Sequence, residues 1–147
     1  MLIRSIDSSP GSAVVTLANM APGDSVISPL IITNSGTLPM RYAMSTATTN
    51  ADGKTLAGQL QLTIRAKTGA LCTAEDGVIL YGPAALSGGA IGSNAQGAQA
   101  GDRTLAAAAT ETLCFKVELP LNTGNAFQNA ATTATFTFDA EQTANNP

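Results

Sequence analysis

The stretch TTATFTFDAEQ, residues 132–142, alternates apolar and polar side chains along most of its length. One side of it holds the apolar set Ala134, Phe136, Phe138 and Ala140, and the other side holds Thr133, Thr135, Thr137 and Asp139. Successive side chains of a β-strand point to opposite faces, so a period of two residues indicates a strand with one buried face. We therefore predict a half-buried strand here.

Three more stretches show the same period: TLPMRYAMST at residues 37–46, GQLQLTIRAK at 58–67 and ETLCFKVEL at 111–119. Such strands belong to antiparallel sheets that have one solvated face. Shorter apolar runs lie at residues 12–18 and 78–81, and turn signals such as Pro22-Gly23 separate the candidate strands. The pattern predicts an all-β fold, a β-sandwich or jelly roll of about seven to nine antiparallel strands.

The length of 147 residues suits one domain, so we predict a single β-sandwich over residues 1–147. Residues 82–102 are rich in Gly and Ala and show no periodicity. Long segments of this kind are functional or disordered, and we predict a long flexible loop there. Residues 143–147 are expected to form a C-terminal tail.

Composition excludes several classes of function. Charged residues make up 12% of the chain, the net charge is −3 and no basic block is present, which argues against a nucleic-acid partner. Histidine is absent, so neither a Ser-His-Asp triad nor a His-ligated zinc site can form. We predict no catalytic, cofactor-binding or metal-binding residue, no enzyme activity, and no membrane span.

The two cysteines, Cys72 and Cys114, are too few to form a four-ligand metal site. A disulfide is the favoured interpretation and implies an oxidising compartment, and two buried free thiols are the alternative. Closing a loop of about 42 residues would stabilise the fold by roughly 4 kcal/mol. Cys114 falls on the outward row of its predicted strand, so it could hold the loop that carries Cys72 against the outside of a sheet.

Pro29 interrupts the apolar run SVISPLIIT at residues 25–33. A proline removes a donor from the strand ladder and is therefore found in edge strands or at bulges. An edge strand either protects itself from pairing or recruits a partner. The sequence leaves an assembly edge and a bulge at a sandwich corner as equal alternatives.

Two regions at opposite ends of the chain resemble the TasA and camelysin family. LANMAPGDSVISPLIITNSGTLPMRYAMS, residues 17–45, is similar to the family segment with a Pro-Gly-Asp turn followed by an Asn-X-Gly pair. ETLCFKVELPLNTGNAFQNAATTATFTFDAEQTANNP, residues 111–147, is similar to the family's closing pair of strands. Residues 46–110 contribute strand pattern alone.

The resemblance implies a secreted bacterial jelly-roll subunit of extracellular biofilm-matrix fibres. In such fibres an N-terminal strand of one subunit completes a sheet of the next, so the partner would be the protein itself, assembled head to tail, with other matrix proteins as further partners. The candidate edge or assembly residues are Leu2, Ile3, Ile27, Pro29 and Ile31. The expected location is extracellular or at the cell surface, with a signal peptide already removed from or absent in this chain.

Two other functions remain open from the sequence. The first is a monomeric adhesive or binding module of the cell surface, although aromatic side chains that could contact a ligand are few. The second, less favoured, is a camelysin-like secreted metalloprotease, for which a chain without histidine offers a poor set of metal ligands.

Overall fold

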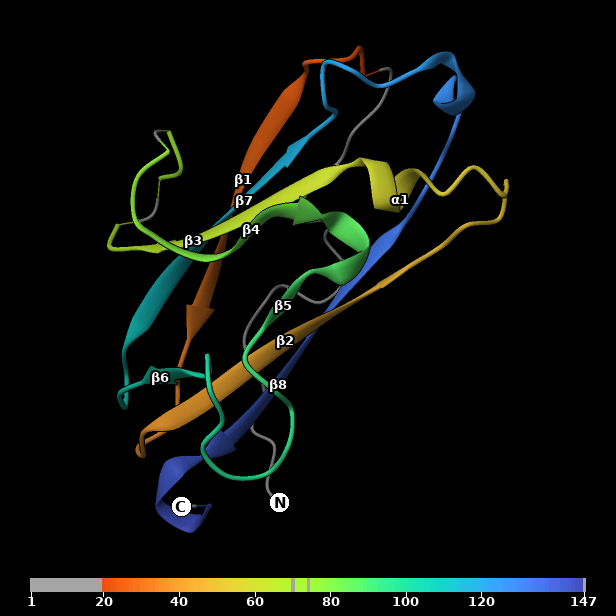
Figure 1. Ribbon diagram of the computed structural model, residues 1–147. Coiled ribbons are helices and arrows are strands. Elements are labelled where there is room, and N and C mark those ends of the chain that lie inside the picture. Colours follow the sequence, from red (N-terminus) through yellow and green to blue (C-terminus); the bar gives the residue numbers. More distant parts are fainter. Residues whose placement is uncertain (1–19, 70, 74, 147) are drawn as a thin grey trace.

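The computed structural model describes residues 20–69, 71–73 and 75–146 (Figure 1). Leu2 and Ile3, two of the candidate assembly residues, lie outside the described residues. The described residues form eight strands, all paired antiparallel, in two layers.

The first layer, which we call the β7 sheet, has the strand order β1-β7-β3-β4. Its strands are β1 (Ser25–Thr33), β7 (Thr110–Glu118), β3 (Gln61–Lys67) and β4 (Val78–Ala85). The second layer, the β2 sheet, is centred on β2 (Met40–Thr48). On one side β2 pairs with β8 (Ala134–Gln142), and on the other with β5 (Ala90–Ile91) and β6 (Arg103–Leu105).

Short helices occupy the connections. They are α1 (Leu56–Gln59) and the 3-10 turns η1 (Leu86–Gly88), η2 (Asn125–Phe127) and η3 (Thr143–Asn145). The eight strands and their pairing confirm the prediction of an antiparallel β-sandwich. The jelly-roll connection stays a prediction.

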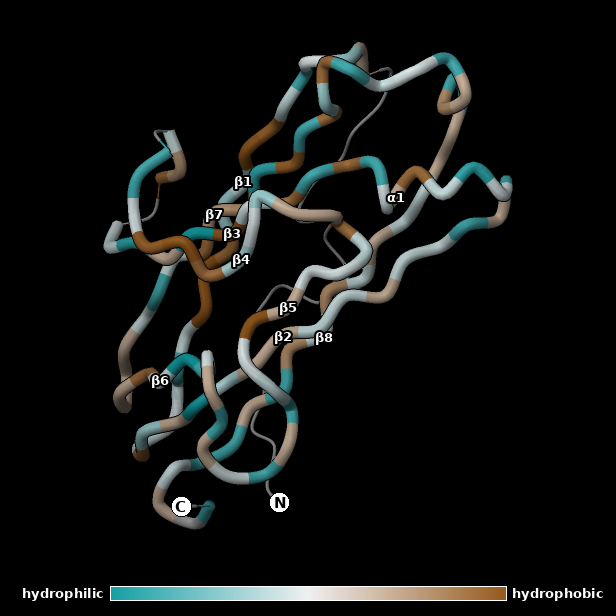
Figure 2. Tube along the Cα trace, viewed as in Figure 1, coloured by the Kyte–Doolittle hydropathy of each residue, from teal (hydrophilic) through white to brown (hydrophobic). Residues whose placement is uncertain are grey.

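The core lies between the two sheets, where the alternating apolar residues meet. Figure 2 shows hydrophobic residues gathered along the strands, above all in the β7 sheet. The largest fully buried side chains are those of Tyr42, Phe115, Ile32, Leu62, Ile64 and Leu113. Each large apolar side chain removed from water in this way contributes about 1.5–3 kcal/mol. Period two in the sequence therefore identified the buried faces of β2, β3, β7 and β8.

Residues 82–102 do not form one long loop, and that prediction needs correction. Strand β4 continues to Ala85, and η1 and β5 follow before a shorter loop over residues 92–102. Backbone pairing between β4 and β3 explains the strand, because Ala and Gly carry no periodic signal yet donate and accept ladder hydrogen bonds like any residue. Asp102 closes the remaining loop by accepting bonds from the backbone N–H groups of Ser93 (2.9 Å) and Gln99 (2.8 Å).

The C-terminal residues 143–146 are also more ordered than a tail. Thr143 begins η3, and its N–H donates to the carbonyl of Pro39 at 3.2 Å. Asn146 is 7% exposed, and its side-chain oxygen accepts a hydrogen bond from Gln96 at 2.8 Å. This end of the chain therefore packs against the loop over residues 92–102.

Candidate functional site

Strand β1, which carries three of the candidate assembly residues, lies at the edge of the β7 sheet. Within the described part of the chain it pairs with β7 alone, from Ser25 opposite Glu118 to Thr33 opposite Thr110. All nine pairs follow one register, so Pro29 lies in an edge strand and not at a bulge. The bulge alternative for this proline is therefore wrong.

The ladder tolerates Pro29 because its nitrogen faces away from β7. The N–H of Leu119 donates to the carbonyl of Asp24 (2.9 Å), and the N–H of Asn34 donates to the carbonyl of Ala109 (2.9 Å). Along an antiparallel strand the N–H and C=O groups of successive residues point to alternate sides. The even-numbered residues of β1 therefore direct their N–H and C=O groups to β7. The odd-numbered residues direct theirs to the open side, where a missing N–H breaks no bond within the sheet.

The side chains of Ile27, Pro29 and Ile31 form one row on the outer face of the β7 sheet. The alternate residues Val26, Leu30 and Ile32 pack against the core. Ile31 is 43% exposed, Pro29 is exposed and Ile27 is half-buried. The β1 edge therefore combines backbone N–H and C=O groups that point away from β7 with a short row of apolar side chains.

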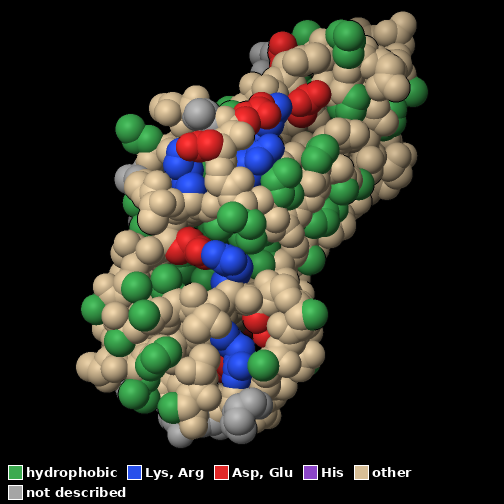
Figure 3. Space-filling model, turned by 60° about the vertical axis from the view of Figure 1, so that its left-hand side comes forward, with side chains coloured by type: hydrophobic (Ala, Val, Ile, Leu, Met, Phe, Trp, Pro, Cys, Tyr) green, Lys and Arg blue, Asp and Glu red, His purple; other side chains and the backbone are tan. Residues whose placement is uncertain are grey.

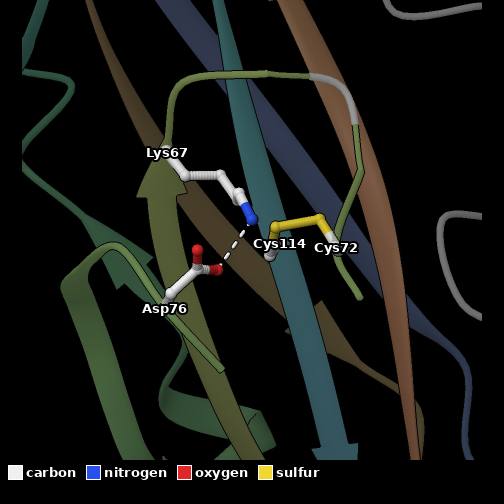
Figure 4. Close-up of a disulfide and its surroundings, with 4 residues drawn as sticks. All are labelled: Lys67, Cys72, Asp76 and Cys114. Carbon is white, nitrogen blue, oxygen red and sulfur yellow. Dashed lines mark hydrogen bonds and ion pairs between the residues drawn. A yellow bond between two sulfur atoms is a disulfide. The ribbon is translucent and has the colours of Figure 1, made fainter. Parts of the chain in front are cut away.

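Cys72 and Cys114 form a disulfide, with 5.6 Å between their Cα atoms, which confirms the predicted pairing (Figure 4). Cys114 lies on the outward row of β7, and the described part of the loop between β3 and β4 passes across the outer face of the sheet to reach it. The prediction that this disulfide holds a loop against the outside of a sheet is also confirmed.

Two ion pairs fasten the same loop. Lys67 Nζ lies 2.7 Å from Asp76 Oδ1, and Lys116 binds Glu75 in the loop. These hydrogen bonds hold the pKa values of Asp76 and Glu75 below their usual range. Both acids therefore contact lysines, and Figure 3 shows acidic and basic side chains adjacent on the face in view.

A polar network joins the two sheets at one end of the core. The Tyr42 hydroxyl donates to Glu111 Oε1, and the Arg103 guanidinium binds both oxygens of the same carboxylate. Burial raises the pKa of Glu111, but the hydrogen bonds from Arg103 and Tyr42 outweigh it and leave the pKa lowered. Burial, with the Glu111 hydrogen bond, raises the pKa of Tyr42. The network connects β2, β6 and β7, and Glu111 accepts three hydrogen bonds from two residues.

A buried ion pair lies on the outer face of the β2 sheet. Arg41 Nε is 2.6 Å from Glu141 Oε1, which also accepts the N–H of Gly97 at 2.9 Å from the covering loop. The adjoining pocket has a volume of about 20 Å³, roughly that of one water molecule. It is too small for an organic substrate. Local sequence patterns could not reveal this pair, because its members are 100 residues apart.

Over the described ranges, no group of three or more His, Cys, Asp or Glu side chains is arranged to hold a metal ion. The helices of the described residues are too short or too polar to cross a membrane. No protein-family model matches the chain, and a search of curated proteins found no significant match.

Proposed function

We propose that this protein is a structural subunit of an extracellular bacterial fibre or biofilm matrix, assembled head to tail by β-strand complementation. The observation that supports it most is the β1 edge. Its nine residues keep a single register with β7, while the backbone groups of Ile27 and Ile31 point to the open side. An added strand would bind there through main-chain hydrogen bonds.

Pro29 gives this edge a preferred alignment. It supplies a carbonyl but no N–H in the middle of the open side, so an incoming strand finds one position without a donor. The apolar row of Ile27, Pro29 and Ile31 then contacts alternate side chains of that strand. A head-to-tail contact that does not close on itself produces a filament.

Two further features agree with a structural role outside the cell. A disulfide persists in oxidising compartments and stabilises a small domain there. Several carboxylates that could act as an acid or base, among them Glu75, Asp76, Glu111 and Glu141, are bound to lysine or arginine side chains. The similarity of residues 17–45 and 111–147 to the TasA and camelysin family supports the same function.

Electron microscopy of the full chain with its native N-terminus tests the proposal. We expect filaments from the wild-type protein and none from Ile27→Pro, which removes an N–H on the open side of β1. Leu71→Ala is the matched control, because Leu71 is exposed on the disulfide loop, away from that edge. A wild-type protein that stays monomeric at high concentration would refute the proposal.

A monomeric adhesive module is the second candidate. Exposed apolar side chains favour it, chiefly Leu71 (69% exposed), Val78 (65%) and Leu121 (81%). Isolated large apolar residues on a surface can contact a ligand, though singly they are common in soluble proteins. Binding of the isolated monomer to a panel of glycans or matrix proteins, without filaments, would favour this candidate.

A further inference from the structure

The sheet edges of this protein differ in how well they are protected from pairing. Edge strands are commonly protected by proline, irregular register or short length. β1 contains Pro29, and β4 contains Pro83 and shifts of register against β3. β5 and β6 have two and three residues. β8 has none of these devices: its nine residues include no Pro, Gly, Lys or Arg and pair with β2 in one register.

The backbone groups on the open side of β8 can be assigned. The N–H of Thr49 donates to the carbonyl of Thr133 (3.0 Å), and the N–H of Thr143 donates to the carbonyl of Pro39 (3.2 Å). The odd-numbered residues of β8 therefore direct their backbone groups to β2. The even-numbered residues, Ala134, Phe136, Phe138 and Ala140, direct theirs away from it. Across the described chain β8 has β2 as its one strand partner.

The side chains of β8 are also suited to another strand. Phe136 packs on Phe115 with 4.9 Å between ring centroids, and Phe138 packs on Tyr42 at 6.1 Å. Both phenylalanines are nevertheless half-buried, although they face the core. On the outer face Thr133, Thr135 and Thr137 are exposed and uncharged. A strand added at this edge would bury more of both rings and meet no charge in the first half of β8.

We propose that β8 pairs antiparallel with β8 of a second copy, with Thr137 opposite Thr137 of the second copy. In this register Phe136 of each copy lies opposite Phe138 of the other copy, which gives two aromatic pairs. Aromatic cross-strand pairs contribute roughly 0.2–1 kcal/mol each. Asp139 then faces Thr135 and Glu141 faces Thr133, so no like charges oppose each other.

Other alignments are less favourable. A parallel in-register pair would set Asp139 opposite Asp139, and like charges directly opposite each other are destabilising. An antiparallel pair centred on Asp139 has the same defect. Centring the pair on Thr135 places Phe136 opposite Ala134 and Phe138 opposite Thr132, which loses both aromatic pairs. Centring on either phenylalanine keeps one aromatic pair only.

This contact deepens the proposed function and rests on it for its place in a fibre. Head-to-tail growth uses the β1 edge, and β8 belongs to the other sheet. Antiparallel β8 pairing is isologous, so it joins two copies and then closes. In a fibre it would join two head-to-tail filaments side by side.

Cross-linking tests the register. Residues opposite each other at a non-hydrogen-bonded position have Cβ atoms about 4.5–5.5 Å apart, close to what a disulfide needs. Thr137→Cys in the full chain should therefore form a covalent dimer on mild oxidation. Ser45→Cys is the matched control: Ser45 is exposed on the same face and lies opposite Thr137 on β2, one strand farther from the edge. Equal cross-linking of both variants, or of neither, would overturn the proposal.

Two lysine substitutions test the electrostatics with the same change of charge. Thr137→Lys sets two ammonium groups opposite each other and should weaken the dimer at least tenfold in sedimentation experiments. Thr135→Lys sets an ammonium group opposite Asp139 of the second copy and should leave the dimer unchanged or tighter. Equal effects of the two variants would contradict the register. A wild-type protein that remains monomeric would refute the contact itself.

The outcome separates the two proposals. Filaments that form with no Thr137→Cys cross-link leave the fibre function standing and remove the β8 contact. Cross-linked dimers in a preparation that never forms filaments support the contact and count against the fibre function.

Discussion

Pro29 on β1 lies directly opposite Cys114 on β7, at the middle of nine pairs that keep one register. Cys114 is in turn bonded to Cys72, whose loop crosses the outer face of the same sheet. The edge strand β1, in which Pro29 lacks an N–H, therefore lies beside β7, the strand that carries the disulfide. The disulfide therefore stabilises β7, the strand against which β1 is paired in the sheet.

The first prediction concerns this disulfide. Cys72→Ala should lower the free energy of unfolding by about 2–4 kcal/mol, because the unfolded chain regains the freedom of a loop of 42 residues. Denaturant unfolding measures the change. Leu71→Ala, at an exposed neighbour in the same loop, should change stability by less than about 0.5 kcal/mol. Mass spectrometry of the wild-type protein should show a gain of two hydrogen atoms on reduction with a thiol.

The second prediction concerns the alternation of backbone groups along β1. Ser28→Pro removes an N–H that faces β7 and should cost about 1–3 kcal/mol, the usual penalty for an unsatisfied buried group. Ile27→Pro removes an N–H on the open side and should cost clearly less. Thermal unfolding of the two variants gives the comparison. Equal destabilisation would show that the assigned direction of these groups is wrong.

The third prediction concerns stability in acid. The hydrogen bonds of Arg103 and Tyr42 leave the folded-state pKa of Glu111 below its ordinary value of 4.5. A carboxyl with a lowered folded pKa stabilises the fold above its unfolded pKa, and that contribution is lost as the pH falls through the folded value. Stability should therefore decline below about pH 4.5. Glu111→Gln should flatten this decline in melts between neutral and acidic pH, and identical profiles would contradict the role of Glu111.

The fourth prediction concerns Gly82, which has a positive φ of 79°. A Cβ atom there would lie 2.0 Å from the backbone oxygen of Leu62, so Gly82→Ala must displace β4 from β3. Backbone strain alone costs about 1–3 kcal/mol, and the clash adds to it. Gly124→Ala is the control, because its Cβ would meet nothing within 4 Å. Similar melting temperatures for both variants would show that β4 can move at little cost.

Much of the fold could be predicted from local pattern. The alternation in residues 132–142 identified the inward phenylalanines of β8, and the alternation in residues 111–119 placed Cys114 on the outer row. The segment 82–102 could not be interpreted in this way. Its Gly and Ala residues have little side-chain area to bury, so its strand β4 is held by backbone hydrogen bonds to β3. Any residue except proline can make such bonds, so composition does not indicate them.

The candidate site was predicted less completely. Pro29 indicated an edge or a bulge, and the pairing of β1 with β7 decided for the edge. The acidic pair Glu75 and Asp76 gave no sign of its lysine partners, because Lys116 lies 41 residues from Glu75 along the chain. The unprotected edge of β8 also went unnoticed, since β8 shows the same alternation as the central strands β2, β3 and β7.

By itself, the sequence determined the fold class, the buried sides of β2, β3, β7 and β8, and the pair of cysteines that could bond. These properties depend on whether a side chain is buried from water and on the residues next to it in the chain. A period of two in the sequence therefore reveals them. Only the tertiary structure decided which strands lie at the edges and which acids meet which bases. Those depend on the pairing of segments far apart in the chain, and a strand has the same local pattern whether one neighbour flanks it or two.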